Sequence, residues 1–313
     1  MQTLLMRILS FLLSAILSVV GLQNRVGDAG SAYTADDEER VLLNVAVVSD
    51  LHTNGWTLHE RNVNLLKLFR GIAKSSTPLD ALVLPGDLTE QAMQGEYATL
   101  FYALKAAGLT ENVLPATGNH DIRGIMGVND FSKSMRNYFA FCETVGIQTD
   151  KSYWATNIEG FTFIVLGSET EEKDSAYLSP MQLLWLDETL YTAEKTGRPV
   201  FLICHQPLAH TNNVDTAWPV GGTVGDQSDA LEAILKKHTD SGLPVVYISG
   251  HLHKDFNAHS FERYGNLYCL NLPSAQFSGG KGVMLEVYSD RILLRARNFI
   301  SGEWLANVYT VTL

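Results

Sequence analysis

Short polar clusters end five apolar stretches of this chain, and their side chains are of the kinds that bind metal ions. The clusters are Asp50-Leu51-His52, Gly86-Asp87, Gly118-Asn119-His120-Asp121, His205 and Gly250-His251-Leu252-His253. They hold five of the nine histidines of the chain. Carboxylate, amide and imidazole groups together suit borderline divalent ions such as zinc, manganese and iron. The spacing therefore predicts a site for two metal ions.

The apolar stretches before these clusters alternate with amphipathic ones, which predicts α/β organisation. The predicted strands are residues 41–48, 81–84, 113–116, 161–166, 200–204 and 245–248. The predicted helices are residues 58–74, 95–107, 131–145, 180–196 and 228–237. After Gly250 the pattern changes to strands at 266–270, 283–288, 292–297 and 304–311. Turn residues separate them, which predicts an antiparallel finish without intervening helices.

Each polar cluster directly follows a predicted strand. In α/β sheets, ligands bind at the carboxyl ends of strands, so these clusters are expected to share one rim. Each motif alone has an ordinary explanation, such as a turn, a helix cap or two residues on one strand face. Their joint occurrence in this order favours a single site.

Length and composition favour one large globular domain, because 313 residues with 46% hydrophobic content can bury a sizeable core. The chain is acidic, with 23 lysines and arginines against 34 aspartates and glutamates, and it has no basic run. Polymeric nucleic acid is therefore not an expected partner. The three cysteines are too few for a disulfide framework, and their state is left open.

The N-terminal segment has the pattern of an export signal. Arg7 precedes the uncharged apolar residues 8–22, and Gly30-Ser31-Ala32 follows as a small-residue stretch. This apolar run is shorter than the ~20 residues usually needed to cross a bilayer. We expect a signal peptide at 1–32, a linker at 33–40 and the catalytic domain at 41–313. The mature protein would then be extracellular, periplasmic or at the cell surface, without stable membrane insertion; the alternative is an uncleaved anchor that tethers it.

The set of motifs resembles the calcineurin-like metallophosphoesterase superfamily, whose blocks are D-x-H, G-D, G-N-H-D/E, H and G-H-x-H. The resemblance spans roughly residues 41–255 and implies an α/β fold, a two-sheet β-sandwich flanked by helices. Three further stretches resemble the bacterial cyclic-nucleotide-phosphodiesterase-like branch. They are Pro85-Gly86-Asp87-Leu88-Thr89-Glu90, the helix with Trp185-Leu186, and His205-Gln206-Pro207.

The resemblance implies a ligand set for two divalent metal ions. The first metal takes Asp50, His52 and His253, and the second takes Asn119, His205 and His251. Asp87 is expected to bridge them, because a carboxylate can present one oxygen to each of two cations ~3.5 to 4 Å apart. The neutral Asn119 limits the negative charge around the metals. Manganese, iron and zinc all remain open as occupants.

A related branch, the purple acid phosphatases, has a tyrosine three residues after the bridging aspartate and a glycine in place of the first motif histidine. This chain has Glu90 and His52 at those positions. We therefore do not expect a ferric-tyrosinate centre.

The expected reaction is hydrolysis of a small phosphate ester by in-line attack of a metal-bridging hydroxide. The resemblance makes His120 the general acid, with Asp121 holding and polarising its imidazole; the alternative for Asp121 is a structural cap. Asn119, His120 and His205 are expected to contact the substrate. We expect a phosphodiesterase, with phosphomonoester hydrolysis as the alternative. A non-catalytic metal-binding scaffold is the rival from another class, although His120 and all seven expected ligands are present.

Residues outside the motifs give weaker signals. The long connection at 206–227 contains Trp218 and Pro219 and is expected to cover the substrate, with a plain surface loop as the alternative. Cys204 is expected to pack as a small hydrophobic residue. The remaining histidines, His59, His210, His238 and His259, are expected to be structural or solvated.

Overall fold

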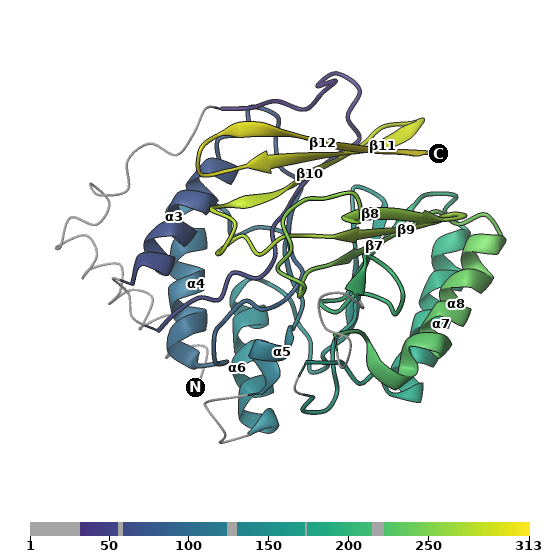
Figure 1. Cartoon of the computed structure of the whole chain (residues 1–313), viewed down its shortest axis with the longest axis horizontal. Coiled ribbons are helices and arrows are strands. Elements are labelled where there is room, and N and C mark those ends of the chain that lie inside the picture. Colours follow the sequence, from purple (N-terminus) through teal and green to yellow (C-terminus); the bar gives the residue numbers. More distant parts are fainter. Residues whose placement is uncertain (1–31, 56–58, 124–129, 173, 215–221) are drawn as a thin grey trace.

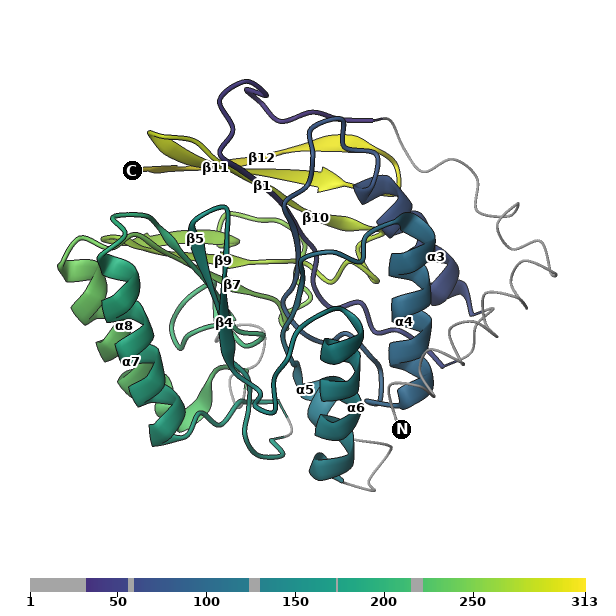
Figure 2. The same cartoon turned by 180° about the vertical axis from the view of Figure 1, so that it is seen from behind.

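A computed structural model of the chain describes residues 32–55, 59–123, 130–172, 174–214 and 222–313 (Figure 1). Within these ranges the strands form two sheets of six. Figures 1 and 2 place α3, α4 and α6 along one side of the molecule and α7 and α8 along the other. The expected α/β fold, a two-sheet sandwich flanked by helices, is confirmed.

The first sheet has the strand order β12-β11-β10-β1-β2-β3. Its strands are β1 (Leu43–Val47), β2 (Ala81–Leu84), β3 (Val113–Pro115), β10 (Lys281–Val287), β11 (Arg291–Asn298) and β12 (Glu303–Thr312). β1, β2 and β3 are parallel, whereas β10, β11 and β12 pair antiparallel. The parallel strands are buried throughout, which explains why they are continuous apolar runs in the sequence.

The second sheet has the order β4-β5-β6-β7-β9-β8. Its strands are β4 (Trp154–Ile158), β5 (Phe161–Val165), β6 (Val200–Ile203), β7 (Val245–Ser249), β8 (Phe261–Tyr264) and β9 (Leu267–Asn271). β5, β6, β7 and β9 run parallel, and β4 and β8 pair antiparallel at the two edges. The carboxyl ends of the parallel strands therefore lie on one rim.

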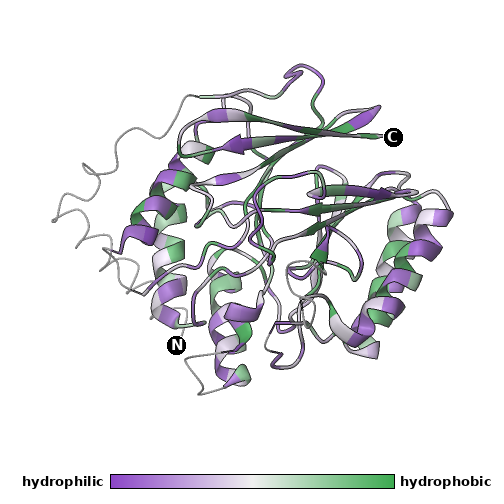
Figure 3. Ribbon diagram, in the orientation of Figure 1, coloured by the Kyte–Doolittle hydropathy of each residue, from purple (hydrophilic) through white to green (hydrophobic). Residues whose placement is uncertain are grey.

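Three layers of apolar side chains hold the sandwich together. Val83 and Phe163 belong to the core between the two sheets. Helices α3 (Glu60–Ile72), α4 (Gln94–Ala107) and α6 (Phe131–Thr144) cover the first sheet with side chains such as Phe69. Helices α7 (Pro180–Glu194) and α8 (Ser228–Asp240) cover the second with side chains such as Leu186. Figure 3 shows the strands as mainly hydrophobic and the helices as mixed, as expected for amphipathic helices over buried sheets.

The predicted helices and strands lie close to the observed ones, including the start of α7, where the Ser179 side chain accepts a hydrogen bond from Gln182 N and Pro180 occupies the first turn. The start of the first predicted helix falls partly outside the described residues. The sequence did not predict β4 and β8. Both are edge strands with exposed polar positions, such as Asn157 and Arg263, so their apolar pattern is weak.

The predicted antiparallel finish is only partly correct. β10, β11 and β12 form it, but β9 lies in the other sheet and pairs parallel with β7. The segment between β9 and β10 crosses from the second sheet to the first. Turn residues in a sequence indicate where a strand ends, but not which sheet receives the next strand.

The expected linker at 33–40 packs against the domain. Tyr33 is 4% exposed, and its hydroxyl donates to the Ile72 carbonyl at 3.0 Å. Ala35 is also buried. The first part of this segment is therefore part of the fold. The expected signal peptide lies outside the described residues, apart from Ala32, and no helix in the described ranges is long and apolar enough to cross a membrane.

Candidate metal centre

Four expected ligands converge at the rim of the sandwich. Asp50 and His52 follow β1, Asp87 follows β2, and His253 follows β7. One possible ligand atom from each lies within 4.8 Å of every other. His253 Nε2 is 2.9 Å from Asp50 Oδ1 and 3.1 Å from His52 Nε2. His52 Nε2 is 3.7 Å from Asp87 Oδ2. This is a compact group of carboxylate and imidazole donors.

The other three expected ligands lie beside the same carboxylates. His205 Nε2 is 3.3 Å from Asp87 Oδ2 and 3.9 Å from Asp50 Oδ1. His251 Nδ1 is 3.1 Å from Asn119 Oδ1, and the His205 and His251 rings are 5.1 Å apart. All seven residues thus meet at one rim. Their individual roles as ligands remain predictions.

The backbone at the rim is in an uncommon conformation. Among the seven expected ligands, five have positive φ values, between 44° and 74°. They are Asp50, His52, Asp87, His251 and His253. Residues with a side chain adopt this region rarely, at a cost of order 1–3 kcal/mol each. Such conformations persist where the surrounding structure enforces them, and here they accompany the convergence of the side chains.

Glycines in the motifs allow the loops to approach closely. A Cβ at Gly118 would lie 2.2 Å from Asp87 Oδ1. A Cβ at Gly250 would lie 2.2 Å from Asp50 Oδ2 and 2.1 Å from the Ser49 hydroxyl. Any side chain at either position would collide with a carboxylate of the cluster. The motif glycines are therefore explained by packing against the site.

The two buried aspartates, Asp50 and Asp87, bring negative charge to the rim, and nearby positive charge must compensate it. Burial acts to raise the pKa of Asp50 and of Asp87, but the neighbouring histidines, His205 first among them, together outweigh it and hold both pKa values below their usual range. Burial acts to lower the pKa of His205, yet Asp87 and Asp50 raise it to about 9. His251 behaves oppositely, since burial and the neighbouring His205 lower its pKa to about 3. A divalent cation at the rim would compensate the same negative charge.

The histidines are also oriented as metal ligands would be. Nδ1 of His205 donates to the Pro85 carbonyl at 2.8 Å, which fixes the ring. Its Nε2 is buried, makes no hydrogen bond among the described residues, and faces Asp87. Metal-ligating histidines commonly donate from one ring nitrogen to a carbonyl and present the other to the metal. The residues present therefore fit a divalent metal centre.

Glu90 belongs to the site, although sequence reasoning did not assign it a role. Its carboxylate Oε2 lies 3.4 Å from His52 Nδ1 and 2.6 Å from Arg61 Nη1. The interaction with His52 lowers the pKa of Glu90 to about 2. Its donor atoms also cluster with those of His52 and His120. The signal was available, because Glu90 stands three residues after Asp87, at the position where the purple acid phosphatases carry their tyrosine.

His120 lies at the edge of the cluster, in contact with Glu90, Arg123 and Asp87. Its Nδ1 donates to the Glu90 carbonyl at 2.8 Å, and Arg123 Nη2 lies 2.6 Å from its Nε2. Its backbone N–H donates to Asp87 Oδ1 at 2.8 Å. Burial lowers the pKa of the His120 imidazole. A nitrogen that accepts a hydrogen bond cannot donate a proton at the same time, so action as general acid requires Arg123 to leave Nε2.

The Asp121 carboxylate contacts the loop that follows Asp87. Its Oδ2 accepts hydrogen bonds from the backbone N–H groups of Leu88 and Gly118, at 3.0 and 2.9 Å. Its Oδ1 accepts from the backbone N–H and the hydroxyl of Thr89, at 3.0 and 2.8 Å. Through these contacts the carboxylate holds the loop after Asp87. They favour the structural alternative for Asp121, since the contact to His120 Nδ1 comes from the Glu90 carbonyl; its catalytic role stays a prediction.

Several other sequence expectations can be placed. Cys204 is a buried free thiol, as expected, and Cys142 and Cys269 are also free and buried. The part of the 206–227 connection that contains Trp218 and Pro219 lies outside the described residues, so its role as a cover stays a prediction. Sequence reasoning also missed Phe277, which lies 5.3 Å from both the His52 and the His253 rings.

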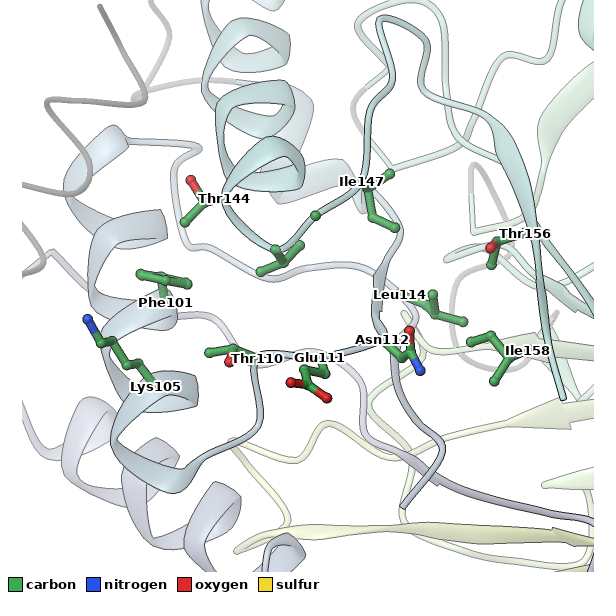
Figure 4. Close-up of a pocket in the computed structure, with 12 residues that line it drawn as sticks. Phe101, Lys105, Thr110, Glu111, Asn112, Leu114, Thr144, Ile147, Thr156 and Ile158 are labelled. Atoms are coloured by element: carbon green, nitrogen blue, oxygen red, sulfur yellow. The ribbon is translucent and has the colours of Figure 1, made fainter. Parts of the chain in front are cut away.

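A cavity of about 660 Å³ lies elsewhere, at the amino end of β3 (Figure 4). Lys105 and Glu111 line it together with Thr156 of β4. None of the expected ligands lines it, and it is at the end of the strand opposite to the polar clusters. The chemistry of the donor set, rather than cavity size, therefore identifies the site.

Comparison with known proteins identifies similar phosphoesterases. The family model described as calcineurin-like phosphoesterase matches residues 43–255. A protein of Fibrobacter succinogenes, named a probable cyclic nucleotide phosphodiesterase, is 25% identical over 172 residues, which is 54% of this chain. The match spans 59% of the length of that relative.

Two solved structures share the fold. A dimetal phosphatase from Danio rerio has a TM-score of 0.59 at 14% identity, covering 87% of this chain and 99% of that one. A purple acid phosphatase from yellow lupin has a TM-score of 0.57 at 12% identity, covering 86% of this chain and 53% of that one. At these identities the likeness concerns the fold alone. The family match and the cluster of aspartates and histidines together lead to one conclusion: the chain belongs to the calcineurin-like phosphoesterase family.

Proposed function

We propose that this protein is a phosphodiesterase that uses two divalent cations. The observation that carries the proposal is the convergence of two donor groups on Asp87. Asp50, His52 and His253 have ligand atoms within 4.8 Å of one another and of Asp87. His205 Nε2 also lies 3.3 Å from Asp87 Oδ2, the oxygen that His52 Nε2 faces at 3.7 Å. Asp87 is therefore suited to face both cations.

The cations, when bound, would polarise the phosphoryl oxygens and lower the pKa of water. The residues of the chain hold and orient the reacting groups. Asn119 contributes a neutral amide, and His251 Nδ1 lies 3.1 Å from its Oδ1. His120 is placed by its contact with the Glu90 carbonyl, and it would give a proton to the leaving oxygen once Arg123 releases Nε2.

Beyond the two cations, the side chains described around the cluster supply little free positive charge, which favours a diester over a monoester as the substrate. A phosphodiester carries one negative charge near neutral pH, and a phosphomonoester carries nearly two. Arg123 contacts His120, but the Arg61 guanidinium is paired with Glu90, 2.6 Å away. This limited positive charge suits the singly charged ester. The name of the Fibrobacter relative, a probable cyclic nucleotide phosphodiesterase, agrees with this choice. Phosphomonoester hydrolysis is the alternative.

The test is hydrolysis of bis(p-nitrophenyl) phosphate and p-nitrophenyl phosphate, in parallel, by the manganese-loaded protein. We expect the diester to be turned over with the higher kcat/KM, and His120→Asn to lower that value by about 10²- to 10⁴-fold. His259→Asn is the matched control, because His259 is an exposed loop histidine, with 54% of its side chain accessible. Faster turnover of the monoester would overturn the diester assignment.

The rival class, a metal-binding scaffold, predicts a different result. Absence of hydrolysis with manganese, iron and zinc, together with a bound ion detected by elemental analysis, would favour the scaffold. Metal content must therefore be measured on the same samples as activity.

We also propose that the protein is exported. Support comes from the sequence pattern of Arg7 followed by the apolar residues 8–22. The mass of the protein recovered outside the cytoplasmic membrane tests this proposal. A mass lacking about the first 32 residues supports a cleaved signal, whereas the full mass supports an uncleaved anchor. Recovery in the cytoplasm alone would contradict export.

A further inference from the structure

Phe277 is an exposed aromatic residue beside the candidate metal centre. It lies in the segment that crosses from β9 to β10, and 55% of it is exposed. Single exposed apolar residues are common on protein surfaces. Tyr191 on α7, at 57% exposed, is an ordinary case. Phe277 differs because of what it touches.

The Phe277 ring contacts the site directly. Its centroid is 5.3 Å from the His52 ring and 5.3 Å from the His253 ring, with tilts of 44° and 46°. The Arg61 guanidinium lies over it, 5.3 Å from the centroid. One part of the ring therefore packs against two expected metal ligands, and the remainder faces solvent.

The backbone that carries Phe277 is fixed to the turn that carries Asp50. The Ser274 hydroxyl donates to the Asp50 carbonyl at 2.9 Å, and the Phe277 N–H donates to the same hydroxyl at 3.3 Å. Ala275 N–H donates to the Ser49 carbonyl at 2.8 Å. A ring that is fixed in an exposed position gains no free energy from burial of its apolar surface. A ring held in place at the rim is suited to receive a ligand.

We propose that Phe277 is a specificity-determining residue that stacks against a planar aromatic group of the ester, such as a nucleobase or an aryl ring. The inference rests on the proposed function, because it requires a phosphate ester to bind at the cluster. A phosphoryl group bound at the metal whose expected ligands include His52 and His253 would bring its substituent close to the exposed part of the Phe277 ring. Stacking of a base or an aryl ring on an aromatic side chain is favourable, and it depends little on which base or which ring substituent is present.

Calorimetric titration of the manganese-loaded protein with three phosphate monoesters tests this inference. The ligands are methyl phosphate, phenyl phosphate and adenosine 5′-monophosphate, which share the phosphate and differ in the attached group. We expect the parent protein to bind at least one planar ester about tenfold more tightly than methyl phosphate. Phe277→Ala should reduce this preference to within about twofold, and Phe277→Trp should keep it. Tyr191→Ala is the matched control and should also keep it.

The outcomes separate the possible explanations. Preference for the adenosine ester alone supports a nucleotide, and preference for both planar esters supports aryl recognition in general. Equal binding of all three ligands by the parent, or an unchanged preference in Phe277→Ala, overturns the proposal. An equal loss of affinity for all three in Phe277→Ala also overturns it, because Phe277 would then only support the histidines. The titration reports binding of the monoesters and does not depend on diester turnover, so the preference can stand even if the diester assay fails.

Discussion

Two clusters in this molecule place histidine between carboxylates, and they differ in environment. At the rim, His205 faces Asp87 and Asp50 at 3.3 and 3.9 Å. Between α7 and α8, His238 Nε2 lies 2.8 Å from Asp187 Oδ1, and its Nδ1 lies 2.6 Å from Glu194 Oε1. The helix cluster has the shorter contacts. Distance alone would therefore select the wrong cluster as the functional one.

Burial and charge balance distinguish the two clusters. The carboxylates at the rim are 0% and 2% exposed, whereas those of Asp187 and Glu194 are 30% and 25% exposed. Lys237 also neutralises Asp187 at 2.7 Å. The helix cluster is thus solvated and balanced by its own cation, on regular helices. The rim holds buried negative charge on backbone with positive φ, which is an arrangement that calls for a metal ion.

The largest expected effect comes from removing charge at the centre of the rim. Asp87→Asn replaces the carboxylate that both donor groups share. We expect kcat/KM for bis(p-nitrophenyl) phosphate to fall by about 10³-fold or more, because Lewis-acid stabilisation worth several kcal/mol depends on the bound cations. Metal content measured by elemental analysis should fall in parallel.

The matched control is Asp187→Asn in the helix cluster. It makes the same chemical change in a carboxylate that also faces a histidine. We expect activity and metal content within about twofold of the parent, as is usual for a surface site away from the chemistry. A similar loss of activity in both variants would show that the comparison between the clusters is mistaken.

A smaller effect is expected from the backbone that supports the rim. Gly118→Ala would place a Cβ 2.2 Å from Asp87 Oδ1, so the carboxylate must move. We expect manganese affinity to fall by about 10- to 100-fold, as for other changes next to metal ligands. Gly95→Ala is the control, because a Cβ there meets nothing within 4 Å. Equal affinity in the two variants, measured by competition with a chelator, would refute the packing explanation of the motif glycine.

The sequence was sufficient for the parallel strands and for the helices that cover them. Strands buried on both faces, such as Ala81–Leu84, are unbroken apolar runs and have little other explanation. Edge strand β8 contains Glu262 and Arg263, so its apolar pattern is weak, and the Gly265-Asn266 turn that pairs it with β9 was the local signal that was missed. The crossing of the chain between the sheets depends on packing of the complete core, so it could not be predicted from turns.

For the site as well, residues that follow a strand could be predicted, and residues placed by long-range contacts could not. The seven expected ligands could be placed because each follows a strand whose carboxyl end reaches the rim. The contacts of Asp121 could not be predicted in the same way, because its carboxylate accepts hydrogen bonds from Leu88 and Thr89, 33 and 32 residues earlier in the chain. Glu90 and Phe277 act through contacts with His52 that only the fold creates, across 38 and 225 residues of chain by their numbers. Long-range contacts between side chains leave no periodic signal in a sequence.

The helix cluster should affect stability rather than activity. His238→Gln removes the group between Asp187 and Glu194, and we expect the free energy of unfolding to fall by about 1 kcal/mol at pH 7. Hydrogen bonds from Lys237 and His238 lower the pKa of Asp187, and those from Ser241 and His238 lower the pKa of Glu194.

The pH dependence of this difference follows from those lowered pKa values. A carboxylate with a lower pKa in the folded state stabilises the fold above its unfolded value, here 3.8 for Asp187 and 4.5 for Glu194. That contribution is lost as the pH falls through the folded value. The difference between parent and His238→Gln in urea unfolding should therefore shrink between about pH 5 and pH 3. A constant difference would mean that packing, not charge, is responsible.

The smallest expected effect is on stability, from an exposed ion pair whose contact distance is as short as that in the helix cluster. Lys236 Nζ lies 2.7 Å from Asp240 Oδ2 on α8, as close as Lys237 Nζ lies to Asp187 Oδ1. The side chains of the former pair are 74% and 64% exposed. An exposed pair of this kind contributes about 0.3 kcal/mol, so Lys236→Ala should be hard to distinguish from the parent by urea unfolding. A loss as large as that of His238→Gln would mean that contact distance ranks the clusters after all, and the reason for favouring the rim would then rest on its donor chemistry alone.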